Sequence, residues 1–191
     1  MIKFKKVLVC GALLVGVSGI GASATFAESN DVPQFSHKLV EDNPESLAEA
    51  NKVLEKYADE IPVSTPLSSK EALDFQERVQ AKAQVAQVSN VKLPYNFPFS
   101  YKYNFASKDF SSLMYPNIQV AINAYTSSDK KIEVVLANSN NGIKGRATVS
   151  TGKYSVVNFP NVGLGSYYVF LKNPSSKNYT IAGNATVTAY R

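Results

Sequence analysis

The chain has 191 residues, a formal net charge of +5, one cysteine and one histidine. This composition excludes an intramolecular disulfide, and it cannot supply the ligands of a typical His/Cys zinc site. The net charge combines two opposed regions: residues 28–90 contain 12 acidic and six basic residues, a net charge of −6, whereas residues 91–191 contain three acidic and 11 basic residues, a net charge of +8. Such an asymmetry indicates a role in interactions.

Residues 1–27 have the features of a secretory signal peptide. Three lysines at the start are followed by an apolar stretch with four glycines and then by small residues, in the order that export signals require. The stretch is shorter than the roughly 20 apolar residues of a membrane-spanning helix. We therefore expect cleavage after Ala24 or Ala27, with loss of Cys10, and no integral membrane segment in the mature chain. The predicted location is secreted, either extracellular or associated with the cell wall, and the absence of disulfides favours a bacterial origin.

Residues 28–90 predict a short acidic segment with two helices. Asn43 and Pro44 supply an N-cap and a proline at the first helical position. Ser68 and Glu71 have the spacing of a capping box at the start of a second helix. The apolar stripes that follow both starts are narrow and rich in alanine. Each helix must therefore dock on another element, pair with the other helix, or remain partly unfolded.

Residues 91–191 predict about seven antiparallel strands, because apolar and polar residues alternate between turn signals. Gly183, within the last strand, suggests a β-bulge. Short connections and one apolar face per strand favour a β-sandwich over a closed barrel. The predicted protein is therefore mainly β, with a signal peptide (1–27), an acidic helical segment (28–90) and a basic antiparallel β-sandwich (91–191). The expected strands cover 99–105, 118–124, 132–136, 144–150, 154–159, 166–172 and 179–190.

Side chains suited to bond-breaking chemistry are scarce. The single histidine, His37, precedes the predicted sandwich, so no Ser-His-Asp arrangement can form within it. The sandwich region contains only three acids, Asp109, Asp129 and Glu133, and we expect Asp129 in a turn and Glu133 on a solvated strand face, not as a catalytic pair. The sequence therefore predicts a non-enzymatic protein without a metal or cofactor, and a hydrolase is the least favoured function.

The remaining signal is a basic surface that carries tyrosines. Tyr167 and Tyr168 are adjacent, so one of them should face away from the core, and Tyr125 falls on the polar face of its strand. Aromatic rings beside lysines suit an anionic cell-wall polymer, a polysaccharide or another protein. Nucleic acid is not expected, because an exported protein leaves the cell's nucleic acids behind. The candidate surface residues are Lys130, Lys131, Lys144, Arg146, Lys153, Tyr125 and Tyr167.

Two functions remain open at this point. The first is a secreted binding or structural protein that acts at the cell surface or in the extracellular matrix through the basic sandwich. The second is a secreted effector, such as a toxin, an antimicrobial or an inhibitor, in which the acidic segment is a pro-region held by opposite charge. A plainer interpretation of the lysines is that they only discourage pairing between sheet edges.

Overall fold

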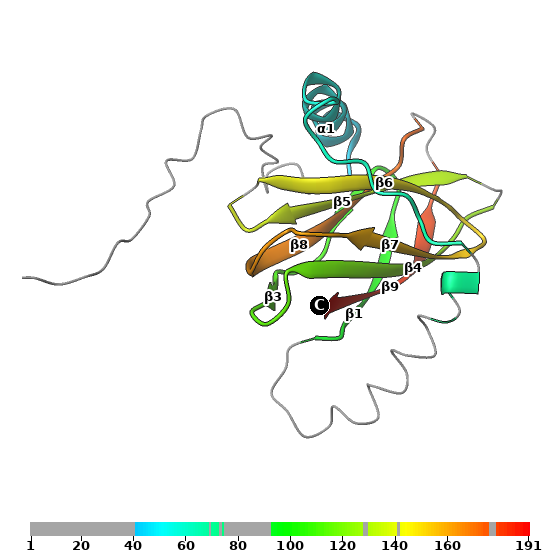
Figure 1. Cartoon of the computed structure of the whole chain (residues 1–191). Coiled ribbons are helices and arrows are strands. Elements are labelled where there is room, and N and C mark those ends of the chain that lie inside the picture. The colour runs from blue at the N-terminus through cyan, green and yellow to red at the C-terminus, as the bar shows by residue number, and fades with distance from the viewer. Residues whose placement is uncertain are drawn as a thin grey trace, which may run out of the picture. The chain divides into compact units, whose positions relative to one another are not determined.

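The computed structural model (Figure 1) describes residues 41–68, 70–72, 74, 93–127, 130–140, 142–175 and 179–191. The predicted signal peptide, His37, Asp129 and most of the second predicted helix lie outside these residues. Within them the chain forms one α-helix of seven or more residues and nine strands: α1 (Pro44–Lys56), β1 (Tyr95–Tyr101), β2 (Asn104–Ala106), β3 (Phe110–Ser112), β4 (Asn117–Tyr125), β5 (Lys131–Asn138), β6 (Ile143–Ser150), β7 (Tyr154–Phe159), β8 (Gly165–Lys172) and β9 (Ile181–Tyr190).

The strands form two antiparallel sheets, so the predicted β-sandwich is confirmed. One sheet has the order β1-β9-β4-β7 and the other has the order β2-β8-β5-β6, with β3 also paired to β8. The chain crosses repeatedly between the sheets, and this strand order is that of a jelly roll. As a consequence, the β1–β2, β4–β5, β6–β7 and β8–β9 connections gather at one end of the sandwich.

The main core lies between the two sheets and follows from period-2 alternation in the strands. In β4, for example, Ile118, Val120 and Ile122 are fully buried. From β1, Phe97 enters the same core, and its ring stacks on that of Phe105 with centroids 5.8 Å apart. Burying each such side chain contributes about 2 kcal/mol to the hydrophobic stabilisation of the fold.

The predicted strand over 99–105 is wrong in one respect: β1 ends at Tyr101 and β2 begins at Asn104 in the other sheet. The carboxylate of Asp42 accepts hydrogen bonds from the backbone N–H groups of Lys102 (2.9 Å), Tyr103 (2.6 Å) and Asn104 (3.2 Å). These N–H groups therefore bond to a distant side chain and not to a neighbouring strand. This break and the unpredicted β3 explain why there are nine strands in the described residues and not about seven.

Gly183 does not mark a bulge. The pairing of β9 with both β1 and β4 runs through Gly183 without interruption. Instead, a Cβ atom at this position would lie 2.1 Å from the backbone oxygen of Asn123, so the glycine permits a close approach of two backbones. The register irregularity that the structure does show lies between Leu136 and Ala137, where β5 pairs with β6.

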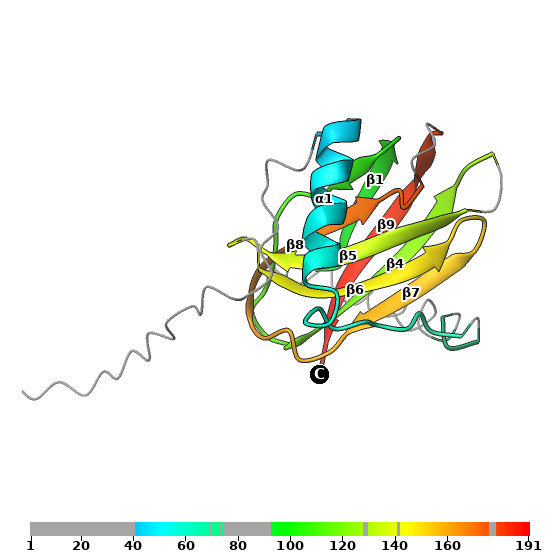
Figure 2. The ribbon, with the colours of Figure 1, turned by 90° about the horizontal axis from the view of Figure 1, so that it is seen from above.

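Helix α1 lies across the outward face of the β2-β8-β5-β6 sheet (Figure 2). Its predicted start is confirmed, because the side chain of Asn43 accepts a hydrogen bond from the N–H of Ser46 at 2.8 Å. The apolar stripe of α1 packs on the sheet. Of the three alternatives left open by the sequence, which were docking, helix pairing and partial unfolding, α1 therefore follows the first. A second core results, made of Ala50, Leu54 and Ile61 against Val135, Ala137, Ile143, Tyr168 and Phe170.

The chain after α1 runs along the side of the sandwich where β6 and β7 are the edge strands. We call residues 62–67 the edge segment. Val63 pairs with Arg146 of β6 and Pro66 pairs with Val157 of β7, so this short stretch covers the edges of both sheets. Beyond it, the predicted capping box is confirmed: the side chain of Glu71 accepts a hydrogen bond from the N–H of Ser68 at 2.9 Å. Covered edges do not offer unpaired backbone groups to other chains.

Candidate functional site: the lysine end

Two neighbouring connections bring together most of the predicted basic residues. The N–H of Gly152, in the β6–β7 turn, donates to the carbonyl of Ala124 at 2.7 Å. Thr151 and Lys130 are joined in both directions, by N–H to carbonyl at 2.8 Å and by N–H to hydroxyl at 2.9 Å. Lys130 is one of these bonded residues. Next to them in the chain are Tyr125 (after Ala124), Lys131 (after Lys130) and Lys153 (after Gly152). We call Tyr125, Lys130, Lys131 and Lys153, together with Tyr179, the lysine end.

Tyr179 joins the third connection, β8–β9, to this surface. The Nζ of Lys130 lies 5.7 Å from the centroid of the Tyr179 ring, a cation–π distance. The hydroxyl of Tyr179 donates to the Asn173 side chain at 2.9 Å, and the amide of Asn173 donates to the carbonyl of Lys102 at 2.8 Å. Hydrogen bonds therefore join the β4–β5 connection to the β6–β7 turn, and the β8–β9 connection to the β1–β2 connection. The contact between Lys130 and Tyr179 links these two pairs.

The exposure of these side chains suits contact with a ligand. Tyr125 is the last residue of β4, and 54% of its surface is exposed. The amide of Asn123 donates a hydrogen bond to the Tyr125 hydroxyl, which fixes the orientation of the ring. Lys131 and Lys153 are exposed, whereas Lys130 is half-buried beside Tyr179. Tyr125, Lys130, Lys131 and Lys153 are thus placed together, as a binding surface requires.

The electrostatic balance of the described part of this surface is positive. The described residues of the β4–β5 connection, the first residue of β5 and the β6–β7 turn contain three lysines and no acid. Lysines held close together repel one another, and an anion that binds among them relieves this repulsion. The arrangement is therefore suited to holding an anionic ligand.

Tyr167 does not belong to this surface, and its prediction as a surface residue is wrong. The side chain is 2% exposed, lies in the core between the sheets and donates a hydrogen bond from its hydroxyl to the carbonyl of Val162 at 2.8 Å. Tyr168 does face the other way, as alternation requires, but α1 covers it completely. Burial raises the pKa of both tyrosines.

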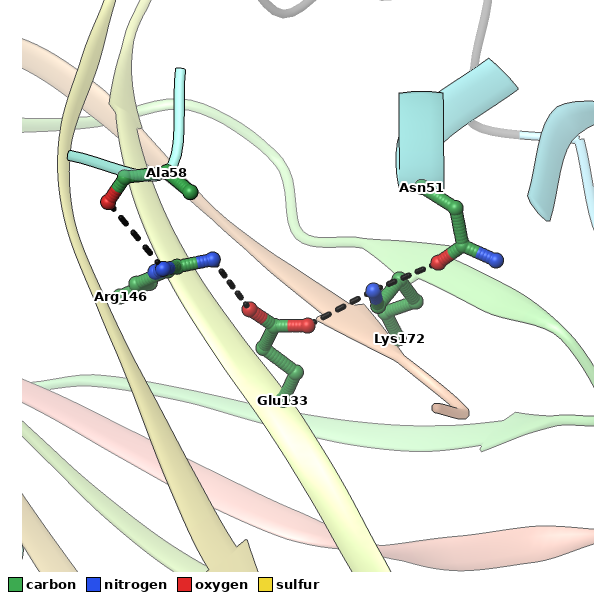
Figure 3. Close-up of polar contacts among 5 residues, drawn as sticks. All are labelled: Asn51, Ala58, Glu133, Arg146 and Lys172. Atoms are coloured by element: carbon green, nitrogen blue, oxygen red, sulfur yellow. Dashed lines mark hydrogen bonds and ion pairs between the residues drawn. The ribbon is translucent and has the colours of Figure 1, made fainter. Parts of the chain in front are cut away.

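Arg146 is also wrong as a surface residue, because it forms part of a polar cluster beside α1 (Figure 3). Its guanidinium lies 3.8 Å from the Glu133 carboxylate and donates to the carbonyl of Ala58 at 3.3 Å. Lys144 is half-buried near the start of β6, whereas Ser150 at the end of that strand pairs with Lys131. Lys144 and Arg146 are therefore separated from the lysine end along the strand.

The expectation that Glu133 lies on a solvated face is wrong as well. The side chain of Glu133 is 13% exposed, and its carboxylate lies 2.7 Å from the Nζ of Lys172. The same Nζ donates to the side-chain oxygen of Asn51 in α1 at 2.7 Å (Figure 3). The only glutamate of the sandwich region thus joins the helix to the sheet through Lys172. Its position beneath α1 assigns it a structural role.

Two further findings concern metals and membranes. In the part of the chain that the structure describes, no group of three or more His, Cys, Asp or Glu side chains is arranged to hold a metal ion. The described helices include none that combines the length and the apolar character needed to cross a bilayer.

Comparisons with known proteins give only weak structural likenesses. No family model matches the chain, and no curated protein matches it. Among solved structures, CBM1 of BiXyn10A in its apo form is similar with a TM-score of 0.35 and 10% identity, over 48% of this chain and 62% of that one. The SPBc2 prophage-derived protein YomS is similar with a TM-score of 0.31 and 10% identity, over 52% of this chain and 99% of that one. The chain therefore spans less than two thirds of the first of these structures.

Proposed function

We propose that this protein is a non-enzymatic binding protein that acts outside the cell, and that its lysine end binds an anionic polysaccharide of the cell surface. One observation carries the proposal: Lys130, Lys131 and Lys153 lie beside Tyr125 and Tyr179 on connections joined by hydrogen bonds. The expected signal peptide supports a location outside the cell.

The strength of such binding comes from several weak contacts. A single exposed lysine–anion contact contributes about 0.5 kcal/mol, so one lysine alone does not hold a ligand. A polymer that offers an anionic group to each lysine adds these contributions, and the fixed loops limit the entropy lost on binding. The ligand should therefore be a repeating polyanion and not a small anion.

The effector alternative, in which the acidic segment is a pro-region, has less support. Ala50, Leu54 and Ile61 are buried against the sandwich, and the edge segment covers both edge strands. Cleavage near residue 90 would leave these contacts in place, and removal of the segment would expose apolar surface. This packing favours an acidic segment that remains part of the working protein.

The test is binding to immobilised polygalacturonate, alginate and hyaluronate, as three acidic polysaccharides. The triple variant Lys130→Gln/Lys131→Gln/Lys153→Gln should bind about tenfold more weakly than the unmodified protein, which corresponds to about 1.4 kcal/mol. Lys108→Gln, which alters an exposed lysine at the opposite end of the sandwich, is the matched control and should bind normally. Raising the salt concentration from about 0.1 M to about 1 M shortens the screening length from about 10 to about 3 Å and should abolish binding. Binding that resists both changes would overturn the proposal.

A further inference from the structure

The outward face of the β1-β9-β4-β7 sheet is unusual because it lacks charge. Charged residues make up 18% of the chain, yet the described residues that alternate with the core positions of these four strands include none. Amides, hydroxyls and tyrosines dominate instead. The face consists of Asn96, Pro98 and Ser100 of β1, Asn117, Gln119, Ala121, Asn123 and Tyr125 of β4, Tyr154, Val156 and Asn158 of β7, and Ala182, Asn184, Thr186, Thr188 and Tyr190 of β9.

The strand register aligns three of these residues in one row across the sheet. Asn123 of β4 pairs with Tyr154 of β7 on one side and with Asn184 of β9 on the other. Side chains that face each other on neighbouring antiparallel strands lie about 5 Å apart at their Cβ atoms. We call Tyr154, Asn123 and Asn184 the amide row. Asn184 is exposed, and the other two members are half-buried.

The amide row adjoins the lysine end directly. Tyr125, which is 54% exposed, lies two residues beyond Asn123 on the same face of β4, and Lys153 immediately precedes Tyr154. On the other side of the row, Ala121 and Val156 pack with Ala72 and Leu67, and Tyr154 itself packs against this cluster. These apolar residues separate the amide row from Asn117 and Asn158 at the other end of the face.

The chemistry of this surface matches that of a sugar. Amide groups and tyrosine hydroxyls both donate and accept hydrogen bonds, as sugar hydroxyls do, and a tyrosine ring offers an apolar face to the C–H groups of a sugar ring. A polyanion without sugar rings, such as polyphosphate, would use the lysines and leave these side chains without a role.

We propose that the ligand of the lysine end is an acidic glycan whose sugar rings lie on Tyr125 and the amide row, while its carboxylates contact Lys130, Lys131 and Lys153. This inference rests on the proposed function and adds to it the surface on which the sugar rings lie. It adds Asn123, Asn184 and Tyr154 as binding residues that the sequence did not indicate, because their alignment depends on pairing between distant strands.

The test compares acidic glycans with a polyanion that has no sugar. Binding of polygalacturonate, alginate and hyaluronate, and separately of inorganic polyphosphate, is measured by titration calorimetry for the variants Tyr125→Ala and Asn184→Ala. Each variant should weaken binding of at least one of the glycans by about fivefold and leave polyphosphate binding unchanged. The controls Tyr115→Ala and Asn140→Ala, at the opposite end of the sandwich, should behave like the unmodified protein. Circular dichroism verifies that every variant is folded.

The outcomes separate the two proposals. If the lysine triple variant loses both kinds of polymer while Tyr125→Ala and Asn184→Ala lose neither, the glycan inference is overturned and the proposed function stands. An equal loss of glycan and polyphosphate binding in Tyr125→Ala and Asn184→Ala also overturns the inference. If the unmodified protein binds none of the glycans, both proposals are wrong, whether or not it binds polyphosphate.

Discussion

At the scale of single residues, Gly183 is the described glycine with the least space for a side chain. A Cβ atom there would lie 2.1 Å from the Asn123 oxygen and 2.9 Å from the Ala124 Cα, and both of these atoms belong to the backbone of β4. Since backbone cannot rotate away as a side chain can, Gly183→Ala must push β9 and β4 apart. We expect the free energy of unfolding to fall by about 3 kcal/mol.

Urea denaturation followed by tyrosine fluorescence measures this change. The neighbouring substitution Ala182→Ser, which alters a half-buried outward position of the same strand, is the control and should change stability by less than about 0.5 kcal/mol. A Gly183→Ala protein as stable as the control would show that the two strands are not as close as described.

Two buried tyrosines predict a loss of stability in alkaline solution. Burial raises the pKa of Tyr101 and Tyr168 above the ordinary value of 10.0. Above pH 10 the unfolded chain releases these protons while the folded chain keeps them, so the unfolded state binds fewer protons and stability falls as the pH rises. Below the unfolded pKa this contribution is fully present.

Tyrosinate absorbance and far-ultraviolet circular dichroism, recorded together during an alkaline titration, test this expectation. Tyr101 and Tyr168 should ionise only when the β-sheet signal disappears, and Tyr101→Phe and Tyr168→Phe should each reduce the absorbance change of that step. Ionisation of all tyrosines while the sheet signal persists would contradict the burial of these two rings.

At the scale of secondary-structure elements, the contact of α1 with the sheet depends on a buried ion pair. Glu133 and Lys172 lie 2.7 Å apart, with side chains 13% and 7% exposed. Removal of Glu133 leaves the Lys172 charge buried without a counter-charge, which costs about 3 kcal/mol, whereas removal of Lys172 leaves Glu133 with the Arg146 guanidinium at 3.8 Å. We expect Glu133→Gln to destabilise the protein by about 3 kcal/mol and Lys172→Met by less, and the double variant to lose less than the sum.

A double-mutant cycle, measured by urea denaturation, tests the coupling of the two residues. Lys131→Met serves as a control because this exposed lysine lies on the same strand as Glu133. Additive losses in the double variant would mean that the two side chains do not interact in solution.

The strands that the sequence predicted well are those whose limits are set locally. The residues of β7 were predicted with their observed bounds, because turns flank a clear alternation on both sides. The break between β1 and β2 was missed since it depends on Asp42, which lies 60 residues away from Lys102 in the chain. Contacts of this kind leave no local pattern for a sequence to show.

The candidate site was predicted only in part, because local patterns indicate its turns, whereas contacts between distant strands determine which residues meet. Lys130, Lys131 and Lys153 flank predicted turns, but their proximity follows from a strand order within the sheets that the sequence did not predict. Tyr167 was assigned to the surface because strand alternation shows that Tyr167 and Tyr168 face opposite ways, so that one of them must point away from the main core. The sequence does not show that α1 covers the sheet face on which Tyr168 lies. The alignment of Asn123 with Asn184 required a register between β4 and β9 that the sequence does not display.

At the scale of the whole molecule, residues 41–68 of the acidic segment pack on the sandwich and form part of the folded structure. Helix α1 covers one sheet face, and the edge segment covers two edge strands. The Nζ of Lys172 forms an ion pair with Glu133 and donates a hydrogen bond to Asn51 of α1. A protein that begins at Val91 would expose Tyr168, Phe170 and the edge of β6. We expect this truncated protein to aggregate or to unfold at much lower urea concentration than a protein that begins at Asp31.

Sedimentation velocity and urea denaturation of the two proteins, purified in parallel, measure this difference. Equal stability and a monomeric state for both would show that the acidic segment is dispensable, and would restore the hypothesis that it is a removable pro-region.

We propose that one end of the sandwich, and not the other, binds an anionic polysaccharide. Titration of oligomers of polygalacturonate, alginate and hyaluronate into the isotope-labelled protein, followed by amide chemical shifts in NMR, tests this most directly. We predict that the shifts change at Tyr125, Lys130, Lys131, Lys153 and Tyr179 and remain constant at Lys108, Leu113 and Leu164 at the opposite end. Changes confined to the opposite end, or none with any of the three glycans at low salt, would contradict it.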